Sequence, residues 1–207
     1  MYEILKGDRV DITKYKQNLS DITIGMGWDA KRSDSKDLII DMVAILADHN
    51  SHFEDVERFI FYNNPILMGK RDEIIKFIPT GDVKNTKSLS DMEQIKLSLF
   101  DLPNSVSEVI FGAAIYDPNT TDHTLKDLSK LHLHLFNSDT QEELAYIKLD
   151  KYFTIETCLI FGKLYRQDEF WKFENISEGY IGDLGSLFGM YYRGEKVDVL
   201  AEGEKDG

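Results

Sequence analysis

The chain has 207 residues, of which 42% are hydrophobic and 12% aromatic, enough for one domain with a full core. Its 37 acidic and 24 basic residues give a net charge of −13. This charge argues against a nucleic-acid-binding protein, because nucleic acids select clustered Lys and Arg. We expect a single domain over residues 1–193 and a polar, flexible tail over 194–207.

The sequence contains no recognisable targeting signal and no pair of cysteines for a disulfide. The single cysteine, Cys158, excludes an intramolecular disulfide framework. The first residues lack the basic start and apolar run of a secretory signal, and no window approaches about eighteen consecutive apolar residues. The sequence therefore predicts a cytoplasmic protein without a transmembrane segment.

The dominant hydrophobic period is two, which is typical of β-strands. Alternating patterns and short apolar runs occur in chain order at 22–26, 38–47, 58–63, 95–99, 109–116, 131–135, 158–165 and 171–173. The segments between them are rich in Asp, Asn, Ser and Gly, which favour turns. The pattern predicts roughly nine or ten strands.

Two short helices are expected. Thr124 and Asp127 form a capping-box pattern that predicts a helix between 123 and 130. A second helical segment is expected over 182–192, weakened by Gly185 and Gly189. Many short strands and few helices predict an all-β fold, a β-sandwich of two mainly antiparallel sheets with one or two short helices.

Catalytic motifs are absent from the sequence. There is no phosphate-binding glycine loop and no GxSxG elbow, and Cys158 lies in an apolar strand where a thiol stays protonated. His132 and His134 point to the same side of one strand and would ligate zinc if a third ligand joined them. No HExxH or CxxC accompanies them, so an outward polar face is the favoured interpretation and the chain is expected not to be an enzyme.

Acidic residues gather near strand ends. The segment 80–95 carries Asp82 at one end and Asp91 and Glu93 at the other, an arrangement that suits a hard cation such as calcium. Its middle carries Lys84 and Lys87, where a calcium loop would have oxygen donors.

Further oxygen donors lie beside other strands. Asp29 follows one strand, and Asn63 follows another. Asp41 lies inside an apolar strand, so its charge carries a burial cost unless something neutralises it. A cation and the backbone amides of a loop are equally good candidates for that role.

The order and spacing of several motifs resemble the TerD family of tellurium-resistance and general stress proteins over nearly the whole chain. The motifs are MGWD (26–29), FYNN (61–64), TGD (80–82), EQI (93–95), NxDTxEELA (137–145), FGKLYR (161–166), FWKF (170–173) and EGY (178–180). The resemblance implies a β-sandwich and a cytoplasmic, non-enzymatic, calcium-binding module of a stress response. It also implies protein partners, in a complex at the inner face of the membrane.

The resemblance further implies a calcium site at one end of the sandwich, with ligands from Asp29, Asp41, Asn63, Asp82, Asp91 and Glu93. The sequence departs from the family pattern in this loop, because Val83, Ser88, Leu89, Ser90 and Met92 replace acidic, amide or glycine positions. Fewer carboxylates predict a weaker site. The alternative is a metal-free interaction module in which Lys84 or Lys87 replaces the ion. An apolar insertion at 66–68 is expected to be a partner contact or a flap over the core.

Overall fold

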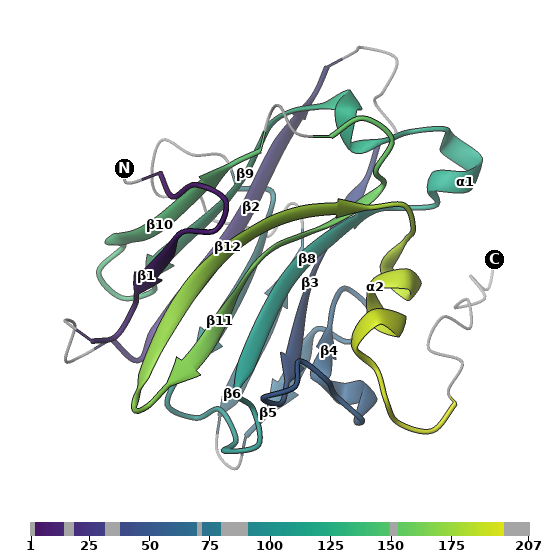
Figure 1. Ribbon diagram of the computed structural model, residues 1–207. Helices are drawn as coiled ribbons and strands as arrows, with labels where there is room; N and C mark the ends of the chain where they lie inside the picture. Colours follow the sequence, from purple (N-terminus) through teal and green to yellow (C-terminus); the bar gives the residue numbers. More distant parts are fainter. Residues whose placement is uncertain are drawn as a thin grey trace.

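The architecture is a sandwich of two six-stranded sheets (Figure 1). This computed structural model describes residues 3–14, 19–31, 38–69, 72–79, 91–149 and 153–196. Every strand pairing within the two sheets is antiparallel. Within the described ranges, no helix has the length and apolar character needed to cross a membrane. The all-β sandwich expected from the sequence is confirmed.

The chain crosses repeatedly between the two sheets and places one to three consecutive strands in a sheet before each crossing. Sheet 1 contains, in spatial order, β1 (Arg9–Asp11), β12 (Phe170–Tyr180), β11 (Cys158–Gln167), β8 (Glu108–Ile115), β3 (Ile40–Ala47) and β4 (Phe59–Ile60). Sheet 2 contains β10 (Glu143–Lys148), β9 (Leu128–Asn137), β2 (Asp21–Ala30), β7 (Glu93–Ser98), β6 (Glu73–Ile78) and β5 (Ile66–Met68).

The main core lies between the sheets and follows from the period of two. Ile22, Ile24 and Met26 of β2 are fully buried in it, so the intervening Thr23, Gly25 and Gly27 lie on the outer face of sheet 2. Leu131, Leu133 and Leu135 of β9 occupy the same core, which directs His132 and His134 outward. The alternation in the sequence therefore predicts correctly which side chains face the core.

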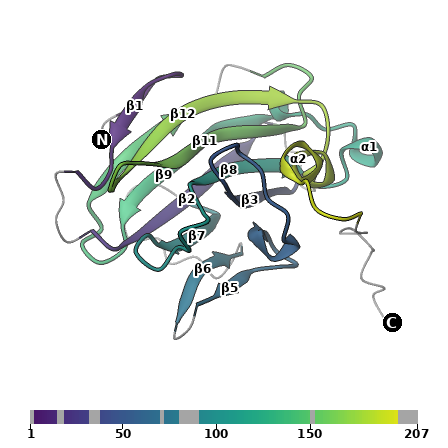
Figure 2. The same ribbon diagram turned by 60° about the horizontal axis from the view of Figure 1, so that its bottom comes forward.

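A second, smaller core covers the outer face of sheet 1. The helix α2 (Leu184–Tyr191) lies across this face in Figure 2, with Leu187 and Phe188 packed on it. The rings of Phe53 and Phe59 each lie 5.2 Å from the ring of Phe188, centroid to centroid, and 6.1 Å from each other. The expected helix over 182–192 is confirmed, and Asp183 caps it by accepting a hydrogen bond from the Ser186 N–H.

The helix expected between 123 and 130 is wrong in length. Only a single 3₁₀ turn forms there, over Leu125–Asp127, and β9 begins at Leu128. The predicted capping contact is present, because the Thr124 N–H donates a hydrogen bond to an Asp127 carboxylate oxygen at 3.0 Å. A short helix, α1 (Pro118–Thr121), and a 3₁₀ turn over Val56–Arg58 were not predicted.

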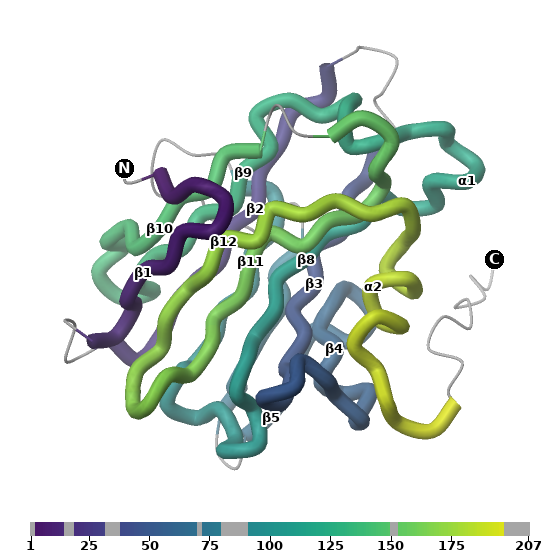
Figure 3. Tube along the Cα trace, in the orientation of Figure 1, coloured from purple at the N-terminus to yellow at the C-terminus, as the bar shows by residue number. Residues whose placement is uncertain are grey.

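The N-terminal segment joins one side of both sheets (Figure 3). The Ile4 N–H donates to the Tyr146 carbonyl of β10 in sheet 2, and β1 pairs with β12 in sheet 1. The buried Asn175 amide donates to the Ile4 carbonyl at 2.8 Å. This segment therefore closes the sandwich at the β10 and β12 side.

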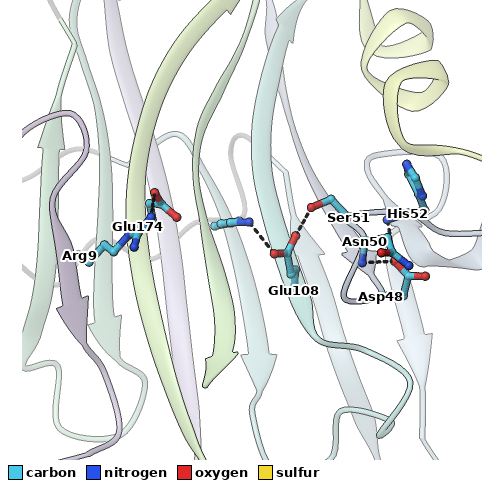
Figure 4. A network of polar contacts seen from close by, with 8 residues as sticks. Arg9, Asp48, Asn50, Ser51, His52, Glu108 and Glu174 are labelled. Atoms are coloured by element: carbon cyan, nitrogen blue, oxygen red, sulfur yellow. Dashed lines mark hydrogen bonds and ion pairs between the residues drawn. The ribbon is translucent and has the colours of Figure 1, made fainter. Parts of the chain in front are cut away.

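A polar network lies on the outer face of sheet 1 (Figure 4). The carboxylate of Glu108 in β8 accepts hydrogen bonds from Ser51 and Lys163, each at 2.5 Å. The turn that carries Ser51 is closed by the Asp48 carboxylate, which accepts from the N–H groups of Asn50 and His52. The network satisfies a nearly buried carboxylate, so we assign it a structural role.

Gly162 of β11 marks the tightest approach in sheet 1. A Cβ there would lie 2.3 Å from the Glu174 carbonyl oxygen and 2.6 Å from a Phe173 ring carbon. We expect Gly162→Ala to lower the free energy of unfolding by about 2 kcal/mol, because the backbone oxygen cannot move without disturbing the β11–β12 ladder. Urea denaturation measures this loss.

Gly189 provides the matched control. It lies in α2, and a Cβ there meets nothing within 4 Å. Gly189→Ala is expected to raise the stability by about 0.5–1 kcal/mol through helix propensity. A Gly162→Ala protein as stable as the wild type would contradict the packing described for β11.

Candidate functional site

Glu93 lies at the start of β7 and points into the space between the sheets. It pairs with Met26 of β2, and both residues belong to the inward-facing set of sheet 2. Its side chain is buried, with 4% of the residue exposed. A carboxylate at this position faces the core rather than water, which raises the cost of its charge.

The carboxylate of Glu93 bridges to sheet 1. Its Oε2 atom accepts a hydrogen bond from the Met42 N–H of β3 at 2.7 Å. β3 pairs with β4 only at Ala44 and Ile45, so the stretch around Met42 is an open edge of sheet 1. Glu93 therefore satisfies an edge donor that has no strand partner.

Asp41 lies next to this contact on β3. Burial raises the pKa of the Asp41 carboxyl to about 6. The pKa of the Glu93 carboxyl is raised to about 8, chiefly by burial. The Met42 hydrogen bond opposes this rise, whereas the charge of Asp41 adds to it. Among the described residues, no Lys, Arg or His forms an ion pair with either carboxylate. Both groups would hold their charge better beside a cation.

Asp91 occupies the opposite, outer face of sheet 2. A Cβ on Gly25 would lie 2.1 Å from an Asp91 carboxylate oxygen, so the carboxylate rests in the space that this glycine leaves open. Gln94 donates to Asp91 at 2.9 Å. Asp91 is buried although no strand or helix of the described residues is stacked on this face.

Two histidines of β9 flank the Asp91 carboxylate. His132 Nε2 lies 3.5 Å and His134 Nδ1 3.8 Å from Asp91 Oδ1, and all three side chains are buried. Burial raises the pKa of the Asp91 carboxyl, but attraction to His132 and His134 and the Gln94 hydrogen bond outweigh burial and lower it to about 2. Asp91 is therefore ionised and held in place at neutral pH.

In the described part of the chain, neither Asp29 nor Asn63 forms a hydrogen bond or ion pair with Asp41 or Glu93. Asp29 is half exposed at the end of β2 and forms an ion pair with Lys130 at 2.6 Å. Asn63 is exposed in the tight turn between Phe61 and Asn64. Asp82 lies outside the described residues, as do Lys84 and Lys87.

In the described residues, the charge of Asp41 acts on Glu93, although the alternation along β3 places Asp41 on the same face as Val43, and Asp91 lies separately with its two histidines. No group of three His, Cys, Asp or Glu side chains within the described ranges could hold a metal ion. Calcium takes six to eight oxygen ligands, including carbonyls and water. Asp41 and Glu93 alone supply fewer oxygen ligands than calcium takes.

The residues that hold Asp91 were not predicted from the sequence. His132 and His134 were expected on an outward polar face, and they are outward but buried against Asp91. A signal was present in β2, where Gly25 and Gly27 alternate with core residues and leave that face without side chains. Such a gap on a sheet face accommodates a neighbouring polar group.

These features define a class: a two-sheet β-sandwich with buried acidic residues at the start of one strand of sheet 2 and at the facing edge of sheet 1. A sequence model of the TerD domain matches residues 1–191. The chain belongs to the TerD family.

Its relatives are named for resistance and stress. Over 186 residues it is 32% identical to tellurium resistance protein TerD of Serratia marcescens, covering 90% of this chain and 94% of that one. Over 185 residues it is 31% identical to general stress protein 16U of Bacillus subtilis (strain 168), covering 89% and 93%. The family membership and these relatives support a role in a stress response.

A solved structure shares the fold. The crystal structure of a homologue of telluride resistance protein (TerD) from Streptomyces coelicolor A3(2) matches with a TM-score of 0.61 at 18% identity. The match covers 83% of this chain and 95% of that one. This structural match therefore supports the fold that the sequence resemblance implies.

Proposed function

We propose that this chain is a non-catalytic, cytoplasmic stress-response module that binds calcium and presents a surface to protein partners. The observation that carries the proposal is the repulsion between Asp41 and Glu93, two buried carboxyls without a basic partner among the described residues. Hard, divalent cations prefer carboxylate oxygens, and a cation would remove the repulsion between the two charges.

In this proposal Asp41 and Glu93 hold the ion at the junction of the two sheets. Asp82 is a further ligand in the proposal, on the basis of the sequence. Because Glu93 also bonds to the Met42 N–H, an ion at Glu93 would link β7 of sheet 2 to the open edge of β3 in sheet 1. The ion would supply a fixed positive charge and order the segments that contact it.

Asp91 has a different place in the proposal. Its carboxylate is already engaged by Gln94, His132 and His134 on the outer face of sheet 2. It lies two residues before Glu93, so this contact fixes the backbone that presents Glu93 to the core. We therefore propose a positioning role for Asp91, while calcium ligation by Asp29 and Asn63 stays a prediction from the sequence.

The relatives named for tellurium resistance and general stress support the stress-response part of the proposal. The net charge of −13 disfavours direct contact with anionic lipid. If the module acts at the inner face of the membrane, we propose that partner proteins hold it there.

Calcium titration tests the proposal. Chelator-stripped protein at pH 7.5 is expected to bind calcium saturably in calorimetry, and its melting temperature should rise with calcium concentration. Asp41→Asn removes one charge from the pair and should weaken calcium binding by about tenfold or more.

Asp168→Asn is the matched control. Asp168 is exposed at the β11–β12 turn, at the other end of β11 from Cys158, which lies level with Asp41 across β8, so its loss should leave the calcium affinity within about twofold. No binding heat and no melting shift at millimolar calcium would rule out the ion. Equal effects of the two substitutions would remove Asp41 from the site.

A further inference from the structure

β5 is the border strand of sheet 2 (Figure 2). Its partner β6 pairs with it through Ile66 opposite Lys76 and Leu67 opposite Ile75. The Phe77 N–H donates to the Pro65 carbonyl at 2.7 Å, which places Pro65 and Phe77 in a hydrogen-bonded pair. Hydrogen-bonded and non-hydrogen-bonded pairs alternate in antiparallel ladders. The N–H and C=O groups of Ile66 therefore point away from β6, toward the open side of the sheet.

A surface pocket of about 950 Å³ lies beside the end of β5. Its apolar lining comes from Met68, Ile74, Phe100 and Pro103. Met68 is 58% exposed and Phe100 71% exposed, so two large apolar side chains stand in water next to an open strand edge. Exposed apolar surface of this kind marks an interaction site, and an apolar edge strand invites pairing with another strand.

The pocket also carries charge, which selects among occupants. Asp72 and Asp101 line it together with the apolar side chains. A second copy of this chain, with its own charge of −13, would bring like charges together. An anionic lipid surface would be repelled in the same way. A polypeptide with basic side chains beside an apolar one complements the described part of the lining and the net charge of the chain.

We propose that β5 and this pocket bind an extended, basic segment of a partner protein, which adds a strand to sheet 2. Backbone hydrogen bonds to Ile66 would fix the register, and one apolar side chain would pack against Met68 and Phe100. Lys or Arg residues next to it would face Asp72 and Asp101. The inference rests on the partner-binding part of the proposed function and gives that part a place and a chemistry.

A pair of synthetic peptides tests the inference. The first is the capped heptapeptide Lys-Val-Lys-Phe-Lys-Val-Lys, and the second replaces each Lys by Glu. In 150 mM salt the basic peptide is expected to bind saturably, and the acidic one to bind at least tenfold more weakly. Amide hydrogen exchange should show new protection at Ile66 when the basic peptide is added. Binding of both peptides with equal affinity, or of neither, overturns the inference.

Three variants separate this site from non-specific attraction. Phe100→Ala removes the exposed ring. Ile66→Pro removes a backbone donor that points away from β6, together with the Ile side chain. Each should weaken basic-peptide binding by about tenfold or more. Phe170→Ala removes an exposed ring at the β11–β12 turn and should leave binding unchanged. Wild-type affinity in Phe100→Ala overturns the inference even if Ile66→Pro fails to fold. A dimer that dissociates in Phe100→Ala would instead make a second copy the occupant and also overturn it.

Calcium binding is measured on the same samples. A protein that binds calcium but not the basic peptide contradicts this inference alone. A protein that binds the peptide through Phe100 but binds no calcium supports the inference and contradicts only the ion-binding part of the proposed function.

Discussion

Asp91→Ala is expected to lower the free energy of unfolding by about 3 kcal/mol at pH 7, because it removes a buried carboxylate that three side chains surround. Gln94 would lose its acceptor at 2.9 Å, and His132 and His134 would face an empty, buried space above Gly25. Urea denaturation followed by tryptophan fluorescence measures the loss.

The stability that Asp91 contributes should decrease as the pH is lowered. The pKa of Asp91 is lowered to about 2, so the stability that this group contributes is present above its ordinary value of 3.8 and is lost as the pH falls toward 2. Glu169→Ala, which removes an exposed carboxylate at the β11–β12 turn, is the control and should change the stability by less than about 0.5 kcal/mol. An equally small effect of Asp91→Ala would contradict the buried contact.

Glu93 is expected to have the opposite pH dependence in the absence of calcium. Burial, opposed by the Met42 hydrogen bond and reinforced by Asp41, raises its pKa from the ordinary 4.5 to about 8. The folded protein therefore keeps the proton that the unfolded chain releases. Stability is full below about pH 4.5 and decreases as the pH rises toward 8.

The expected loss is on the order of 3 kcal/mol by pH 8, since one pKa unit corresponds to about 1.4 kcal/mol and local relaxation reduces the total. Asp41, with a pKa raised to about 6, contributes a loss of the same sign between about pH 4 and 6. Thermal melting in chelator from pH 4 to 8 measures both. A melting temperature that rises over this range would contradict the pKa values of the pair.

Much of the fold could be predicted from the sequence because it follows from alternation. β2 and β9 carry strict apolar alternation and were predicted with their inward faces. β1, β5, β6 and β10 were not predicted as strands. β1 and β5 are three residues long, too short for a period of two to stand out. The apolar insertion at 66–68 is a border strand whose Leu67 packs against the core, and a partner contact there stays a prediction.

Less of the candidate site could be predicted from the sequence. Asp41 was predicted to carry a burial cost, and its raised pKa agrees with that expectation. The pairing of Glu93 with the Met42 N–H depends on the approach of two sheets, which no local pattern encodes. The role of His132 and His134 around Asp91 depends on the space left by Gly25 in a strand that is distant in sequence.

The most direct test of the account is the melting temperature of wild type and Glu93→Gln at pH 8, each with chelator and with 5 mM calcium. Glutamine keeps an acceptor for the Met42 N–H and removes the buried charge. Without calcium, Glu93→Gln should be more stable than the wild type by several degrees. Calcium should raise the melting temperature of the wild type and leave the variant nearly unchanged. A variant less stable than the wild type in chelator, or a wild type that does not respond to calcium, would contradict the assignment of Glu93 to a cation site.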